Sequence, residues 1–158
     1  MEIHVENAAD AYLALLAQRG IKYFFANAGT DFAPLVESFA KRTSEDEPCP
    51  TPILCPHEST AVSMVHGYTM ITGEPQAVMV HVTVGTANAA AQVMNASRAQ
   101  VPILFSAGRT PLNEEGVLGN RDVYIHWAQE SRDQAAMLRE YVKWDYELRN
   151  PGQLETVV

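Results

Sequence analysis

The chain alternates short apolar runs with helical patterns, and this alternation restricts it to a small set of folds. The apolar runs are continuous, as in residues 76–81, where Val78, Met79 and Val80 follow one another. Strands of this kind are buried on both faces, which is typical of a parallel sheet with helices on each side. We therefore expect an α/β fold with a doubly wound, mainly parallel sheet in a three-layer αβα arrangement.

Glycines and prolines between these runs mark the expected element boundaries. Helices are expected over residues 7–19, 32–41, 59–72, 86–99 and 125–139, with a last one beginning near 150 and cut off by the chain end. Strands are expected over residues 22–26, 53–55, 76–81, 101–107 and 141–146. No repeat or linker interrupts the series, so residues 1–158 are expected to form one domain.

Composition excludes several classes of partner. The net charge of −8 repels phosphate backbones and anionic lipids, so we expect neither nucleic-acid nor membrane binding. No apolar run approaches the roughly 20 residues of a membrane span, and residues 1–4 lack a signal-peptide layout. A cytoplasmic protein with two reduced thiols, Cys49 and Cys55, is the expectation.

The loops that follow the expected strands carry the candidate chemistry. Loops after parallel strands gather at one sheet edge, where open α/β sheets bind ligands. Glu58 stands between a short strand and a helix, in the segment Pro56-His57-Glu58. It can be a helix-start carboxylate, stabilised by about 0.3–1 kcal/mol by the helix dipole, or an acid that acts on a ligand. Ser59 offers a competing helix cap, which lowers the structural need for Glu58.

Two further positions in these loops have open interpretations. His81 ends a strong apolar run, so it is either a satisfied edge residue or a catalyst. His81, His57 and Cys55 are also residue types that can bind zinc, although their spacing in the sequence matches no known zinc site. Gly85 precedes an expected helix and either lets a ligand approach the backbone or forms a tight turn; the sequence around it is neither GxGxxG nor a P-loop.

The ordered set of motifs resembles the N-terminal pyrimidine-binding domain of thiamine-diphosphate-dependent enzymes. The similar subgroup contains acetohydroxyacid synthase, benzoylformate decarboxylase and related 2-keto-acid decarboxylases. The motifs that carry the resemblance are Phe24-Phe25-Ala26-Asn27-Ala28-Gly29, His57-Glu58-Ser59-Thr60-Ala61, Gly67-Tyr68-Thr69 before Gly73, Val84-Gly85-Thr86-Ala87-Asn88 and Val101-Pro102-Ile103-Leu104.

The resemblance implies a role for Glu58. In this family a glutamate at that position hydrogen-bonds N1′ of the cofactor's aminopyrimidine and so promotes loss of the C2 proton of the thiazolium. The cofactor then attacks a small 2-keto acid and carbon dioxide leaves. Asn27, Gly29, Gly85 and Asn88 are implied to line the same cofactor site.

Two substrate-facing residues are also implied. His81 lies four residues before Gly85, as does an active-site histidine of benzoylformate decarboxylase, and Thr30 stands where that enzyme has a serine. Both are expected to face the substrate carboxylate or the developing alkoxide, with His81 catalytic. The family's Gly-Pro-Gly turn reads Thr83-Val84-Gly85 here, and no unique alignment assigns roles to His126, Trp127 or Gln129.

The family holds the diphosphate and Mg²⁺ through a second domain with a Gly-Asp-Gly motif, which this sequence lacks. The resemblance therefore implies a partner domain or subunit, a homodimer or tetramer, and a chain that binds the cofactor weakly and is inactive alone. The chain is then part of a lyase or transferase, either as a piece of a longer protein or as the small subunit of a split decarboxylase. A non-catalytic interaction domain of the same fold is the remaining alternative.

Overall fold

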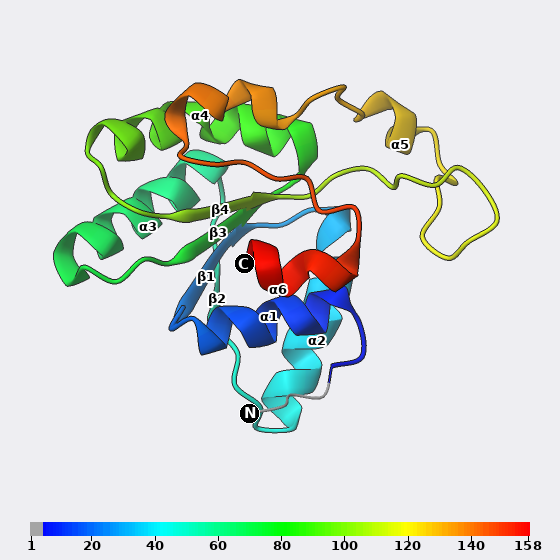
Figure 1. Cartoon of the computed structure of the whole chain (residues 1–158), viewed down its shortest axis with the longest axis horizontal. Helices are drawn as coiled ribbons and strands as arrows, with labels where there is room; N and C mark the ends of the chain where they lie inside the picture. Colours follow the sequence, from blue (N-terminus) through cyan, green and yellow to red (C-terminus); the bar gives the residue numbers. More distant parts are fainter. Residues whose placement is uncertain (1–4) are drawn as a thin grey trace.

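A computed structural model describes residues 5–158, so the signal-peptide argument on residues 1–4 lies outside the described part. The centre of the molecule is a four-stranded sheet in which every pairing is parallel and the strand order is β2-β1-β3-β4 (Figure 1). The strands are β1 (Tyr23–Asn27), β2 (Thr51–Leu54), β3 (Ala77–Val80) and β4 (Leu104–Ala107). The predicted parallel sheet is confirmed.

Helices cover both faces of this sheet, which confirms the three-layer αβα fold (Figure 1). One face packs against α1 (Ala8–Gln18) and α2 (Ala33–Ser44), and the other against α3 (Glu58–Thr72) and α4 (Val82–Arg98). Neighbouring residues of β1 point to opposite faces of the sheet. Phe24 packs in the hydrophobic cluster under α1 and α2, and Phe25 packs in the cluster under α3 and α4. This two-sided burial explains the continuous apolar runs.

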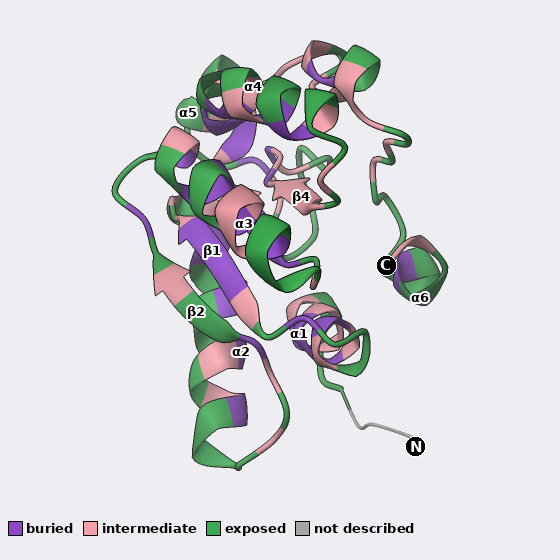
Figure 2. Ribbon diagram, turned by 90° about the vertical axis from the view of Figure 1, so that its left-hand side faces the viewer, coloured by how far each residue is buried: buried purple, intermediate pink, exposed green. Residues whose placement is uncertain are grey.

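Sheet position decides how far each strand is buried. The expectation of two-sided burial holds for the central β1 and β3, but it is wrong for β2, which lies at one edge with Leu54 79% exposed (Figure 2). The other edge strand, β4, is half-buried along its length. An edge strand has a neighbour on one side only, so it is covered less completely.

The segment after β4 departs most from expectation. The predicted helix over 125–139 is wrong: it is reduced to α5 (Ile125–Ala128) and two 3-10 turns, η2 (Ala135–Met137) and η3 (Arg139–Tyr141). The predicted strand over 141–146 is also wrong, because these residues pair with no strand of the described sheet. After another 3-10 turn, η4 (Pro151–Gln153), the short α6 (Leu154–Val157) returns beside α1 (Figure 1).

Side-chain contacts explain why the helix over 125–139 does not form. Gln134 donates to the Thr86 hydroxyl and to the Gly108 carbonyl, both at 3.0 Å, and accepts from the Thr83 hydroxyl at 3.2 Å. Arg139 pairs with Asp133 and Asp145. The Gln134 contacts tie the segment to the start of α4 and to the residue after β4, and such tertiary contacts outweigh modest helix propensities.

A buried ion pair joins α1 to α2. Arg42 Nε donates to Asp10 Oδ1 at 2.6 Å, and both side chains are almost completely buried. Glu47 lies 3.1 Å from the same guanidinium, and the Pro48 carbonyl accepts from it. The two helices therefore depend on charge pairing as well as on apolar packing.

The order β2-β1-β3-β4 creates a topological switch point between β1 and β3. The chain leaves β1 toward the α2 face and leaves β3 toward the α4 face. In open α/β sheets such a switch point, at the carboxyl ends of the strands, is where ligands bind. Within residues 5–158, no helix is both long and apolar enough to cross a bilayer.

Candidate functional site

Glu58 occupies the first turn of α3, at the carboxyl edge of the sheet. Its side chain is buried, and Asn88 Nδ2 of α4 donates to its Oε2 at 3.2 Å. His57, not Ser59, caps the helix: its Nδ1 accepts from the Ser59 amide at 3.1 Å. Ser59 instead donates through its hydroxyl to the Asn88 carbonyl at 3.0 Å. Glu58 is therefore not needed as a cap, and α3 and α4 are joined beside it.

One oxygen of this buried carboxylate remains available. Within residues 5–158, Oε1 of Glu58 accepts no hydrogen bond. A Cβ at Gly85 would lie 3.3 Å from this oxygen and 3.0 Å from Val80 Cβ. Glycine at position 85 thus leaves room beside the carboxylate, and a buried acceptor with a free oxygen fits a ring nitrogen that shares a proton.

The backbone around Gly85 differs from expectation. The helix begins at Val82 and not at Thr86, so Thr83-Val84-Gly85 is its first turn and not a loop. The Gly85 amide donates to the His81 carbonyl at 2.8 Å. Gly85 therefore contributes space to the site, and its N–H is already used within the helix.

His81 lies between two side chains that come from distant segments. Its Nδ1 is 2.6 Å from Asp31 Oδ1, and its Nε2 is 3.2 Å from the amide nitrogen of Gln129. The N-cap position of α2 is occupied by Phe32, which makes no side-chain cap, and Asp31 faces His81 instead.

Gly29 makes room for the imidazole. A Cβ at Gly29 would lie 2.3 Å from the ring of His81. We expect Gly29→Ala to displace this ring and to destabilise the chain by about 1–3 kcal/mol, the usual cost of overpacking. The matched control is Gly67→Ala within α3, where nothing lies within 4 Å and helix propensity favours alanine by about 0.5–1 kcal/mol. Urea unfolding of both variants measures the difference, and equal midpoints would refute the steric argument.

The other predicted site residues lie nearby with different contacts. Asn27 ends β1 and donates to the Cys55 carbonyl at 2.9 Å, which fastens the turn before Glu58. Thr30 is exposed at the start of the 3-10 turn η1 (Thr30–Phe32). The loop after β4 brings only Gln129 to His81; His126 is paired with Asp122, and Trp127 is about half exposed.

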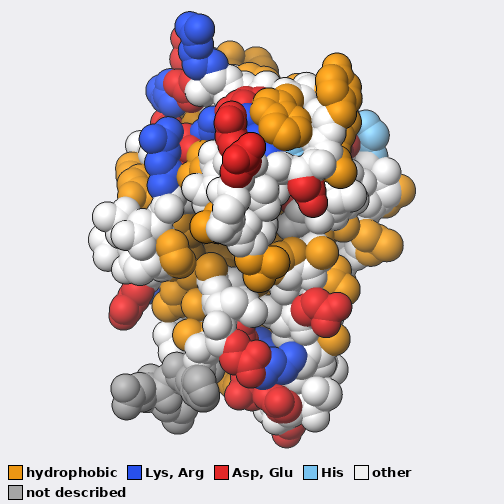
Figure 3. All heavy atoms as spheres, turned by 90° about the vertical axis from the view of Figure 1, so that its right-hand side faces the viewer, with side chains coloured by type: hydrophobic (Ala, Val, Ile, Leu, Met, Phe, Trp, Pro, Cys, Tyr) orange, Lys and Arg blue, Asp and Glu red, His pale blue; other side chains and the backbone are white. Residues whose placement is uncertain are grey.

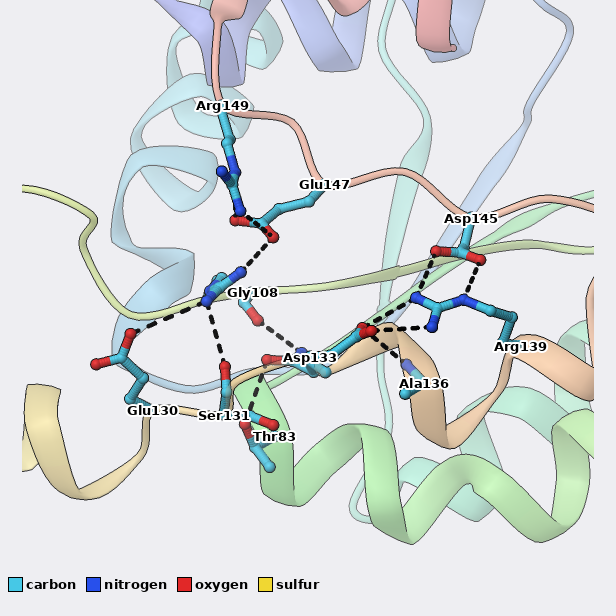
Figure 4. Close-up of polar contacts among 12 residues, drawn as sticks. Thr83, Gly108, Glu130, Ser131, Asp133, Ala136, Arg139, Asp145, Glu147 and Arg149 are labelled. Carbon is cyan, nitrogen blue, oxygen red and sulfur yellow. Dashed lines mark hydrogen bonds and ion pairs between the residues drawn. The ribbon is translucent and has the colours of Figure 1, made fainter.

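A polar network holds the segment that follows Gln129, including Glu130, Ser131 and Asp133 (Figure 4). The Thr83 hydroxyl donates to the Gln129 carbonyl at 3.1 Å, and Arg109 donates to the Ser131 carbonyl at 3.2 Å. Glu130 pairs with Arg121 at 2.5 Å, and the hydrogen bond from Arg121 lowers the pKa of the Glu130 carboxyl. Residues 129–134 are therefore fixed against the start of α4.

The zinc alternative gains no support from the geometry. Across residues 5–158, no three histidine, cysteine, aspartate or glutamate side chains gather as a metal site requires. Cys55 is buried, burial raises the pKa of its thiol, and its Sγ lies 3.7 Å from the Ile53 carbonyl. The thiol thus belongs to the core below the site.

Asp31, Gln129 and Gln134 are the contributors that the sequence did not identify as site residues. Asp31 had one usable signal, since it lies in the loop that follows an apolar run, at the sheet edge where open α/β folds bind ligands. Gln129 was one of three residues to which no unique alignment assigned a role, and Gln134 had no signal, because both lie in a segment whose pattern predicted a continuous helix.

Residues 6–137 match the family model described as "Thiamine pyrophosphate enzyme, N-terminal TPP binding domain". A Mycobacterium tuberculosis protein named as an acetolactate synthase large subunit, IlvX, is 32% identical over 102 residues, covering 65% of this chain and 19% of that protein. Benzoylformate decarboxylase of Pseudomonas aeruginosa is 26% identical over 136 residues, covering 84% of this chain and 22% of that enzyme. The chain thus spans about a fifth of the length of these curated relatives.

Solved structures show the same architecture. A Mycobacterium smegmatis protein described as a thiamin diphosphate-dependent enzyme superposes with a TM-score of 0.77 at 26% identity, covering 98% of this chain and 27% of that one. Benzoylformate decarboxylase from Polynucleobacter necessarius superposes with a TM-score of 0.75, covering 97% of this chain and 26% of that one. At 18% identity, the second likeness concerns the fold alone.

Proposed function

The chain belongs to the thiamine pyrophosphate enzymes, as their N-terminal TPP-binding domain, and we propose that it is the pyrimidine-binding half of an enzyme acting on 2-keto acids. The reaction is decarboxylation or an acetolactate-synthase-like transfer, and residues 1–158 form one domain for this purpose. The observation that carries the proposal is Glu58, a buried carboxylate at the sheet edge with one free oxygen.

Glu58 would hold the proton of the aminopyrimidine ring through its free Oε1. Asn88 supports this role, because its hydrogen bond to Oε2 fixes the carboxylate while leaving Oε1 open. Asn27 keeps the preceding turn in place through Cys55, and Gly85 leaves the space beside the carboxylate. Thiamine diphosphate supplies the electron sink for the reaction, and the chain supplies orientation and proton control.

His81 and Thr30 would form the substrate end of the site. Both lie at the switch point between β1 and β3, where the loops after the two strands diverge. Gly29 packs against the His81 ring and so helps to set its position at this edge of the sheet. A small 2-keto acid would bind there, within reach of the imidazole.

A second domain or subunit would bind the diphosphate and Mg²⁺. The sequence contains no Gly-Asp-Gly, and the chain covers only about a fifth of its curated relatives. The outer faces of α3 and α4 carry exposed apolar side chains, namely Met64, Met70, Ile71, Val84 and Met94. Further exposed hydrophobic side chains lie on another face of the molecule (Figure 3). Such surfaces are consistent with a dimer or tetramer.

The proposal predicts that the protein needs both halves for turnover. The protein completed by its diphosphate-binding domain should bind thiamine diphosphate in the presence of Mg²⁺ and release carbon dioxide from 2-keto acids such as pyruvate or benzoylformate. Residues 1–158 alone should release none, since half of the cofactor site is missing. Calorimetry and a carbon dioxide release assay measure the two properties. A completed protein that binds no thiamine diphosphate would identify the chain as a non-catalytic domain of this fold.

A further inference from the structure

The proposed function leaves open how His81 is held and which proton it carries, and three features of its surroundings bear on this. The first is the Asp31 carboxylate, whose Oδ1 lies 2.6 Å from His81 Nδ1. The two side chains are 11% and 19% exposed, so bulk water screens their contact only in part. Asp31 comes from the loop after β1 and His81 from the end of β3, which are neighbours in the sheet.

The second feature is the space left for this pair by two glycines on separate loops. A Cβ at Gly29 would lie 2.3 Å from the imidazole, and a Cβ at Gly108 would lie 1.5 Å from Asp31 Oδ2. Real Cβ atoms never come so close, so any larger residue at either position would displace one partner. Gly29 follows β1 and Gly108 follows β4. Two loops thus accommodate one carboxylate–imidazole pair.

The third feature is a strained residue next to the histidine. Val82 has φ +36°, a region that a β-branched residue rarely adopts and that strains the backbone. In this conformation the Val82 amide points at Asp31 Oδ2, with the nitrogen 3.4 Å from that oxygen. Asp31 therefore contacts both the ring of His81 and the backbone immediately after it.

The hydrogen-bonding neighbours of the ring agree on one tautomer. A carboxylate only accepts, so the Nδ1 facing Asp31 must carry a hydrogen. The nitrogen of Gln129 only donates, so the Nε2 that it faces must accept. We propose that Asp31 is a positioning residue that fixes His81 as the neutral Nδ1–H tautomer, with Nε2 as the proton acceptor of the site and Gln129 as its donor in the resting state.

This assignment sharpens the role of His81 and, for its catalytic consequence, rests on the proposed function. A neutral imidazole that presents a lone pair does not attract a substrate carboxylate. It does accept a hydrogen bond from a hydroxyl. The substrate's carbonyl oxygen would gain a proton from water as it becomes a hydroxyl, and His81 Nε2 would take that proton when the product carbonyl re-forms and then release it to water. While Nε2 holds that proton, the ring is positively charged, and the Asp31 carboxylate stabilises this charge at Nδ1.

Nitrogen NMR on the complete protein labelled with ring-¹⁵N histidine reads the tautomer directly. The His81 signals, assigned by their loss in His81→Gln, should show a pyrrole-type Nδ1 and a pyridine-type Nε2 in the wild type. Asp31→Asn should weaken this preference and populate the Nε2–H form. Two pyrrole-type nitrogens in the wild type, or an unchanged tautomer in Asp31→Asn, would overturn the proposal. The wild-type spectrum decides even if Asp31→Asn does not fold.

Asp122→Asn is the matched control, because Asp122 is an exposed aspartate paired with another histidine, His126, at 3.4 Å. It should leave the His81 signals and turnover unchanged. In the active protein, Asp31→Asn should lower kcat by about 10²-fold or more with KM within a few-fold, as expected for lost acid–base function. If His81 shows the predicted tautomer but the protein decarboxylates no 2-keto acid, only the proposed function is rejected. If the protein is active but His81 is an imidazolium, only the tautomer assignment is rejected.

Discussion

Replacing Glu58 by glutamine is expected to lower turnover of the completed enzyme by about 10²–10⁴-fold, the usual contribution of a positioned acid–base group. The substitution preserves size and can keep a hydrogen bond with Asn88, since that residue offers both a donor and an acceptor. What it removes is the ability of Oε1 to take a proton from a ring nitrogen. The defect should therefore appear in kcat, while the protein stays folded.

The measurement is steady-state carbon dioxide release together with calorimetric binding of thiamine diphosphate. Glu37→Gln is the matched control, because Glu37 is exposed on α2, on the other side of the sheet from Glu58. It should retain wild-type turnover. Equal rates for Glu58→Gln and Glu37→Gln would show that the buried carboxylate has no part in activating the cofactor.

Breaking the Asp10–Arg42 pair is expected to cost about 3–5 kcal/mol of unfolding free energy, because removing one partner leaves the other charge buried. Asp10→Leu would leave the guanidinium with Glu47, whose carboxylate is about one-third exposed. Arg42→Met would leave the Asp10 carboxylate beside Lys41, whose Nζ is 3.6 Å away. Urea unfolding of this chain measures both losses.

The double variant Asp10→Leu/Arg42→Met separates charge from packing. Apolar replacement of both partners is often neutral or stabilising, so the double variant should be more stable than either single variant. Lys22→Met is the control, because its pair with Glu74 is about half exposed and contributes about 0–1 kcal/mol. A double variant that loses the sum of both single losses would mean that packing, rather than pairing, dominates at this site.

Patterns that are local in the chain predicted much of the molecule. The order of the first four strands and helices followed from apolar runs and glycine stops, and the helix that begins at Glu58 was placed to within one residue. Burial of individual strands did not follow, because it depends on sheet order: β2 lies at an edge, and its Leu54 is exposed. A short apolar run has the same sequence pattern whether its strand lies at the edge or at the centre of the sheet.

The prediction of a helix in the segment after β4 was wrong for a related reason. Its residues have adequate helical spacing, yet the side chain of Gln134 finds partners at Thr83, Thr86 and Gly108 that a continuous helix would not let it reach. The sequence of residues 125–139 does not predict these contacts, because the partners lie in other segments of the chain. Competition between local propensity and tertiary contacts is decided only when both segments are in place.

By itself, the sequence determined the α/β alternation, the family resemblance and the presence of Glu58 at the start of a helix on the carboxyl edge of the sheet. The tertiary structure decided which side chains meet there. Asp31 and His81 are 50 positions apart, and they touch because β1 and β3 are neighbours and because Gly29 and Gly108 leave the space. Periodicity reports only which face of its own element a residue occupies, whereas pairing across loops depends on the order in which the sheet assembles its strands.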